Sequence, residues 1–208
     1  MINKKISKTK KKLIEVAREL FAQKGKRNIT MNDIAEASNK GRRTLYTYFN
    51  NKEEIFRAVI DKELEYLTEQ LQKVFNESAE PDIKLQKHIL THLDAIKFVV
   101  NRNGSLRADF FRDIYEVERA RKKVDQVEIN LIKKILYDGI QKKIFKRIDP
   151  ELSSVVIFYA IKGLEVPYIR QSLTSQFENH KISIVEFIFS GISRKCKNQG
   201  DQDHEVIL

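Results

Sequence analysis

The chain has 208 residues, of which 41% are apolar and 33% are charged, and its formal net charge is +10. This apolar content excludes a disordered chain, and seven Gly with three Pro are too few for the turns of an all-β protein. The single cysteine, Cys196, excludes an internal disulfide framework and suits a reducing compartment. No apolar run approaches the ~20 residues of a membrane helix. We therefore expect an all-α, soluble and cytoplasmic protein that does not span a membrane.

The positive charge is concentrated in the first 60 residues. This segment holds 15 Lys and Arg against 6 Asp and Glu, whereas the remainder holds 24 against 23. An excess confined to one segment is typical of a protein that binds a polyanion through it. A membrane surface would attract the same charge, so the residue pattern has to discriminate between the two partners.

Three short helices are predicted in this basic segment. The first runs from about Lys8 to Lys24, and Gly25 ends it as a left-handed cap. Thr30 and Asp33 resemble a capping box that opens the second helix. A tight polar turn over residues 38–41 then leads to a third helix, about Arg42 to Phe49. Two short helices joined by a turn of about four residues form a helix-turn-helix.

The third helix carries the side chains that suit DNA. Leu45 and Phe49 share the face that packs inward, so the other side chains point outward. Arg can bond guanine, Thr can contact a base edge, and Tyr hydroxyls or a Lys ammonium suit phosphate. Any one of these residues alone is more often a solvated charge or a packing residue. The charge excess, the turn and the outward set coincide here, which favours DNA binding.

This segment resembles the N-terminal signature of TetR-type transcriptional regulators over roughly residues 10–56. The resemblance rests on Glu19-Leu-Phe21, Gly25, Thr30-Met-Asn-Asp-Ile-Ala35, Thr44-Leu-Tyr-Thr-Tyr-Phe49 and Asn51-Lys-Glu-Glu54. Two departures are Asn39-Lys40-Gly41 before the recognition helix, and Arg43 where the family commonly has a small residue. The resemblance implies base contacts by Arg42, Arg43, Thr44 and Thr47, and phosphate contacts by Thr30, Tyr46, Tyr48 and Lys52.

The rest of the chain is predicted to form a helical body. A fourth helix opens at Asn51 and runs without a break into this body. Further helices are expected at about Ile83–Asn101, Leu106–Ile114, from there to near Lys143, from Pro150 to about Thr174 with an interruption at Pro167, and at Ile182–Lys195. The resulting division is a DNA-binding domain at 1–56, a ligand-binding and dimerisation domain at 57–196, and a disordered tail at 197–208.

The last two predicted helices are apolar on more than one face, which indicates a subunit interface. Its candidate residues are Val155, Phe158, Tyr159, Ile184, Phe187 and Ile188. Phe187 and Phe189 lie about 200° apart on a helix, so only one of them should face a partner. A central core helix is the alternative for the segment around Val155. The resemblance implies a four-helix bundle across a dimer.

The resemblance also implies that the body binds a small-molecule effector. The candidate pocket residues are His92, Phe98, Phe110, Phe111, Tyr115, Tyr137 and Tyr159, although aromatic residues at helical spacing are usually core. His88 and His92 are four residues apart, a spacing that could offer two imidazoles to a metal, but ordinary pocket or surface histidines are the better interpretation. Asp109 and Asp113 are interpreted as surface ion pairs with Arg107 and Arg112. No catalytic set, cofactor motif or metal cluster is recognisable.

These features predict a homodimeric, sequence-specific DNA-binding regulator, a repressor that a small molecule releases from a palindromic operator. The alternative is a basic helical protein that binds nucleic acid, or an anionic membrane, without specificity. That alternative requires neither the turn spacing nor the outward Arg, Thr and Tyr set. An enzyme built in the body is a further alternative, for which the sequence offers no chemistry.

Overall fold

The computed structural model describes residues 7–104, 114–169 and 174–194, and their side chains at 7–104, 117–165 and 182–194. These parts are helical, as predicted. The elements are α1 (Lys8–Lys24), the 3-10 turn η1 (Lys26–Asn28), α2 (Met31–Ala37), α3 (Arg42–Tyr48), α4 (Lys52–Asn76), α5 (Pro81–Arg102), α7 (Ile114–Gln141), α8 (Pro150–Ile169) and α9 (Thr174–Ile192). The helix expected at 106–114, apart from Ile114 itself, and the tail expected at 197–208 lie outside the described residues. No helix in the described ranges is long and apolar enough to cross a membrane.

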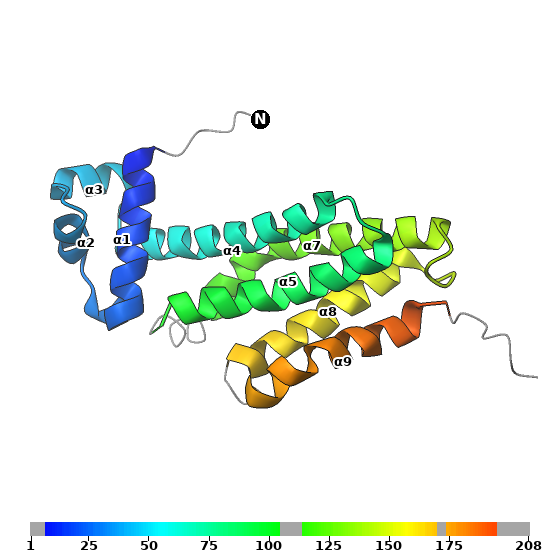
Figure 1. Ribbon diagram of the computed structural model, residues 1–208. Coiled ribbons are helices and arrows are strands. Elements are labelled where there is room, and N and C mark those ends of the chain that lie inside the picture. The colour runs from blue at the N-terminus through cyan, green and yellow to red at the C-terminus, as the bar shows by residue number, and fades with distance from the viewer. Residues whose placement is uncertain (1–6, 105–113, 170–173, 195–208) are drawn as a thin grey trace, which may run out of the picture.

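The first three helices form a compact head at one end of α4 (Figure 1). The predicted capping box is present in full, because Thr30 Oγ1 accepts from the Asp33 N–H and Asp33 Oδ2 accepts from the Thr30 N–H. Gly25 ends α1 with a φ of 77° and donates its N–H to the Phe21 carbonyl at 2.8 Å. Its ψ of 148° is extended, so the cap uses the positive φ of glycine without the left-handed helical conformation that we expected.

The head continues into the body through α4, a helix of 25 residues. Asn51 caps it by accepting from the Glu54 N–H at 2.9 Å. The Glu54 carboxylate accepts from the backbone N–H and the side-chain amide of Asn50, so it does not complete a capping box with Asn51. The buried core of the head includes α4 residues as far as Leu64, and α4 residues from Leu67 onward belong to the core of the body. The two parts therefore share one rigid helix.

The body consists of α4, α5, α7, α8 and α9, with α9 on the outside against α8 (Figure 1). Asp149 Oδ1 caps α8 by accepting from the N–H groups of Glu151 and Leu152 at 2.8 and 3.3 Å. The helix is described as far as Ile169 and continues without a break through Pro167, where we expected an interruption. Our expected start of the last helix at Ile182 was wrong, because α9 begins at Thr174. Residues 174–181 contain one apolar residue, Phe177, and so lack an apolar period, but they are compatible with a helix.

Candidate functional site

The recognition helix α3 is held by its inner face. Leu45 and Phe49 are buried in the head core. The turn before α3 uses Asn39 in the left-handed conformation, with a φ of 54°, which asparagine tolerates better than most residues. Gly41 precedes the helix as its N-cap and supplies no side-chain hydrogen bond. The position of α3 therefore depends on its apolar contacts and on the turn.

The side chains expected to contact DNA lie along the outer face of α3. Arg42, Arg43, Tyr46 and Thr47 are exposed, and Thr44 and Tyr48 are half-buried. The Thr47 hydroxyl donates to the Arg43 carbonyl at 2.9 Å, so it has to rotate before it can meet a base edge. The helix α3 thus presents two guanidinium groups, two tyrosine phenols and two threonine hydroxyls.

Two residues expected to contact phosphate already have partners inside the head. Lys52 Nζ donates to the backbone carbonyls of Lys26 and Ile29 at 2.9 and 2.8 Å. The Thr30 hydroxyl donates to Asp33 Oδ2 at 2.7 Å. Lys52 therefore ties the start of α4 to the loop between α1 and α2, a role that the sequence pattern did not indicate.

A cluster of charged residues joins the head to the body. Arg18 of α1 donates to the backbone carbonyl of Arg102 at the end of α5 at 3.1 Å. The Arg102 guanidinium lies 2.9 Å from Glu63 of α4. Burial raises the pKa of Glu63 against the opposing charge of Arg102. After α5, Gly104 has a φ of 39°, and a Cβ at this position would lie 2.9 Å from the Ala22 carbonyl oxygen of α1.

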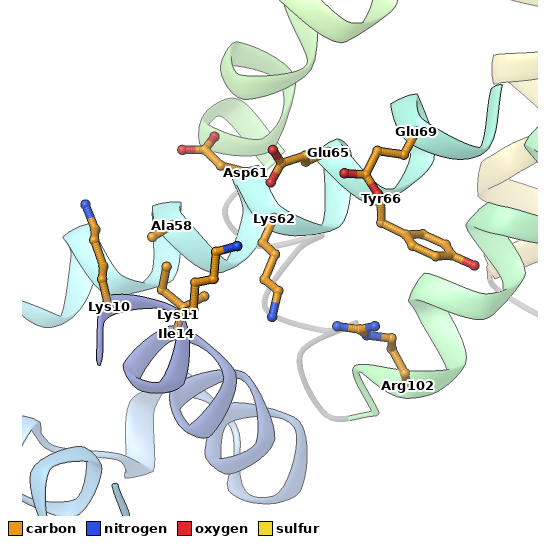
Figure 2. A pocket seen from close by; sticks show the side chains of 10 residues that line it. All are labelled: Lys10, Lys11, Ile14, Ala58, Asp61, Lys62, Glu65, Tyr66, Glu69 and Arg102. Atoms are coloured by element: carbon orange, nitrogen blue, oxygen red, sulfur yellow. The ribbon is translucent and has the colours of Figure 1, made fainter. Parts of the chain in front are cut away.

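A cleft of about 390 Å³ opens beside this junction, between α1, α4 and the end of α5 (Figure 2). Its lining side chains are Lys10, Lys11, Ile14, Ala58, Asp61, Lys62, Glu65, Tyr66, Glu69 and Arg102. Lys62 pairs with Glu15 of α1, so one basic group of the lining is already engaged by the head. Most of the lining residues are charged, with both signs present, and none of the predicted pocket residues whose side chains are described belongs to the lining.

A second polar cluster lies inside the body and connects α5, α7 and α8. His92 Nδ1 contacts Glu128 Oε1 at 2.7 Å, and His92 Nε2 contacts Glu165 Oε1 at 2.8 Å. Arg121 binds Glu165 with two hydrogen bonds of 2.5 and 2.6 Å, and His88 Nε2 lies 3.2 Å from Glu128 Oε1. We call these five residues the buried network, because each is at least nine-tenths buried.

The charges of the buried network stabilise one another. Burial opposes the protonation of His92, but the charge of Glu128 and the hydrogen bonds to Glu128 and Glu165 raise the pKa of His92 to about 9. Burial likewise disfavours ionised Glu165, but hydrogen bonds from His92 and Arg121 lower its pKa to about 2. Burial also disfavours ionised Glu128, but the charge of His92 lowers the pKa of this carboxyl group. His92 is therefore an imidazolium between two carboxylates at neutral pH.

The predicted pocket residues do not surround a common space in the described side chains. His92 is fully buried, whereas Phe98, Tyr137 and Tyr159 are exposed. The ring of Phe98 packs on Tyr66, with the centroids 5.0 Å apart. The remaining candidates, Phe110, Phe111 and the side chain of Tyr115, lie outside the described residues. Within the described part of the chain, no group of three or more His, Cys, Asp or Glu side chains is arranged to hold a metal ion.

An apolar surface lies on α8 and α9. Phe187 of α9 is 81% exposed and Tyr159 of α8 is 60% exposed, and we call the exposed apolar side chains of these two helices the α8/α9 face. Its further exposed members are Leu152, Val155, Val156 and Ile182. Ile184 and Ile188, also interface candidates, are only partly buried and pack against the body core. Phe158 was expected in the interface, but it is fully buried in the body core.

Known proteins resemble both parts of the chain. The model of the bacterial regulatory proteins of the tetR family matches residues 13–59. YhgD, an uncharacterized helix-turn-helix regulator of Bacillus subtilis, is 29% identical over 71% of this chain and 78% of its own length. A transcriptional regulator from Cytophaga hutchinsonii has a similar structure, with a TM-score of 0.73, 23% identity and coverage of 88% of this chain and 97% of its own.

A second solved structure adds a bound ligand. It is the transcriptional regulator FadR from Bacillus subtilis in complex with stearoyl-CoA, with a TM-score of 0.62, 22% identity and coverage of 87% and 98%. The matched segment of the family model contains the helix-turn-helix described above, and the structural likeness extends over the body. The chain belongs to the TetR family of DNA-binding transcriptional regulators, a family of regulators rather than enzymes.

Proposed function

We propose that this regulator is a homodimeric repressor that binds a palindromic operator and is released by a small-molecule effector bound in the body. The observation that carries the proposal is the α8/α9 face, because both helices expose large apolar side chains, among them Phe187 of α9 and Tyr159 of α8. Exposed apolar surface of this kind marks interaction sites. A second copy of the same chain is the partner that closes such a face symmetrically.

A dimer provides the second DNA-binding head that specific binding requires. A three-helix head makes few phosphate contacts, so specific binding at cytoplasmic salt concentrations normally needs two heads on two half-sites. Two heads related by a two-fold axis require a palindrome with half-site centres about 34–36 Å apart, or a multiple of this distance. In each half-site we assign base contacts to Arg42, Arg43, Thr44 and Thr47. Thr30, Tyr46, Tyr48 and Lys52 are assigned to the phosphates.

The effector part of the proposal is supported by related regulators. The Bacillus subtilis structure contains stearoyl-CoA. The structure of SmeT, which is similar in fold with a TM-score of 0.68 at 10% identity, contains triclosan. Both ligands are organic molecules with a large apolar part, and the helical body of this chain is the part with a comparable apolar interior.

Selection of the preferred duplex from a random DNA library tests the proposal. We expect a palindromic sequence to be enriched, and we expect the chain to sediment as a dimer at micromolar concentration. A salt series on the selected and on random duplexes then separates specific binding from charge attraction, because only the electrostatic part falls with salt. Equal affinity for both duplexes, or a monomer, would contradict the proposal and favour the non-specific binding protein.

A further inference from the structure

The buried network contains two polar atoms that the rest of the fold does not use. His88 Nδ1 and Glu128 Oε2 are buried and have no hydrogen-bond partner among the described residues. Their side chains are 0% and 1% exposed. Buried polar atoms in folded proteins are nearly always paired, and an unpaired one is costly. The two atoms are therefore unused acceptor or donor positions inside the body.

The other contacts of the network define what kind of group can pair with the two atoms. His88 Nε2 faces the carboxylate oxygen Glu128 Oε1 at 3.2 Å, so the tautomer that fits this contact has its proton on Nε2 and offers Nδ1 as an acceptor. Glu128 Oε2 is a carboxylate oxygen and also accepts. Both unused atoms therefore require a hydrogen-bond donor, either O–H or N–H.

The charges of the network argue against an ionised ligand. Glu128 and Glu165 are balanced by His92 and Arg121, and all four are buried. An ammonium group would add a buried charge without a counter-ion, which is costly. A carboxylate or phosphate would place acceptor oxygens against two acceptors. An uncharged donor is the group that fits.

The surroundings of the network are apolar. Leu85, Ile89 and Leu93 alternate with His88 and His92 along α5 and are completely buried. Ile132 of α7 and Ile161 of α8 belong to the same buried cluster. A molecule that reaches the network therefore has an apolar body and carries its donor at a defined point.

We propose that the buried network recognises the effector through His88 Nδ1 and Glu128 Oε2, and that this effector is an apolar molecule with an uncharged O–H or N–H donor. Alcohols and carboxamides have this chemistry, and carboxylates and phosphates do not. The inference rests on the proposed function, because it assumes that the body binds an effector. It adds the chemical class of the ligand and the residues that select it.

Calorimetric titration of the full-length chain with four probes of equal apolar character tests the proposal. The probes are 1-decanol, decanamide, decyl methyl ether and decanoate. We expect the alcohol and the amide to bind about tenfold more tightly than the ether, which has no donor, and more tightly than the carboxylate. Equal affinity of alcohol and ether, tighter binding of decanoate, or no saturable binding of any probe would overturn the proposal. This comparison uses the unaltered chain and does not depend on whether a variant folds.

Two variants locate the selectivity. His88→Phe keeps a ring but removes the Nδ1 acceptor, so the preference for alcohol over ether should fall to within about twofold. Glu128→Gln introduces a donor into the site, so the preference should shift toward the ether, an acceptor. Gln86→Leu, at a half-buried polar residue of α5 outside the network, is the matched control and should retain the preference. Retention of full selectivity in His88→Phe and Glu128→Gln would overturn the assignment of these residues.

Binding to the selected operator is measured on the same preparations. If the chain binds its selected operator normally but does not prefer the donor probes, the inference alone is refuted. If the unaltered chain shows no preference for any operator, the proposed function is refuted, whichever probes bind.

Discussion

Arg18 Nη1 donates a hydrogen bond to the backbone carbonyl oxygen of Arg102 at 3.1 Å, and this bond ties α1 to the C-terminal end of α5. Carbonyl groups in the last turn of a helix have no partner within the helix, so a basic side chain satisfies one of them here. Arg102 in turn pairs with Glu63 of α4 at 2.9 Å. The head is therefore held by α5 of the body as well as by its continuation into α4.

We expect Arg18→Ala to lower the free energy of unfolding by about 1–3 kcal/mol, because the Arg102 carbonyl and Glu15 both lose a partner. Urea denaturation followed by circular dichroism measures this change. Arg27→Ala, at an exposed position of η1, is the control and should change stability by no more than about 0.5 kcal/mol. Equal effects of the two substitutions would show that the junction contributes nothing to stability.

Phe187→Arg and Phe189→Arg should have different consequences although the residues are neighbours on α9. Phe187 is exposed on the α8/α9 face, whereas Phe189 packs edge-on against Phe145 with ring centroids 6.1 Å apart. Phe187→Arg should give a folded monomer with weak operator binding, because it places a charge in the proposed dimer interface. Phe189→Arg should destabilise the body by several kcal/mol. Sedimentation velocity and thermal unfolding distinguish the outcomes, and a dimeric Phe187→Arg would refute this interface.

Arg43→Ala should change specificity, and Lys52→Ala should not. An Arg that reads guanine contributes about 1–3 kcal/mol at particular base pairs, so Arg43→Ala should relax the preference there. Binding to single-base variants of the selected operator measures this. A uniform loss on all duplexes for Arg43→Ala would contradict base recognition.

Lys52→Ala should weaken all duplexes alike and reduce the salt slope by about one unit if its ammonium reaches a phosphate. It should also lower the stability of the head by about 1–3 kcal/mol, because two backbone carbonyls lose their donor. Denaturation without DNA separates the second effect from the first. An unchanged salt slope with reduced stability would leave Lys52 with a structural role only.

The buried network predicts a stability maximum at mildly acidic pH. The pKa of His92 rises from 6.5 to about 9 on folding, so its contribution is complete below pH 6.5 and is lost as the pH rises through 9. The pKa of Glu165 falls from 4.5 to about 2, so its contribution is present above pH 4.5 and is lost as the pH falls through 2. The free energy of unfolding from urea titrations should therefore fall by up to about 3 kcal/mol between pH 6.5 and 9. In Glu128→Gln this alkaline decline should be smaller, because the charge that retains the His92 proton is gone.

The head could be predicted almost residue by residue because its boundaries depend on local signals. Gly25, the Thr30–Asp33 box and Asn51 each act within one helical turn of the boundary they set. The TetR resemblance also rests on such short-range spacing. The start of α9 was missed because its first turns carry no apolar period.

The interior of the body could not be predicted in the same way. The sequence places His88 and His92 on one helical face, but their partner Glu128 is 36 residues from His92, and Glu165 is 73 residues from it. Only the packing of α5, α7 and α8 brings these charges together. Phe158 was assigned to the surface because a helix that is apolar on several sides gives no indication of which side faces inward.

Gly104 determines how closely the body can approach the DNA-binding head. Its φ is positive, and a Cβ at this position would lie 2.9 Å from the Ala22 carbonyl oxygen, so there is room for a hydrogen atom but not for a methyl group. Any larger residue there would push the end of α5 away from α1 and tilt the recognition helix relative to the body. In the dimer that we propose, two heads have to match two grooves on one side of a duplex, so a small tilt is doubled across the two-fold axis. A single added methyl group would thus change operator occupancy without contacting DNA.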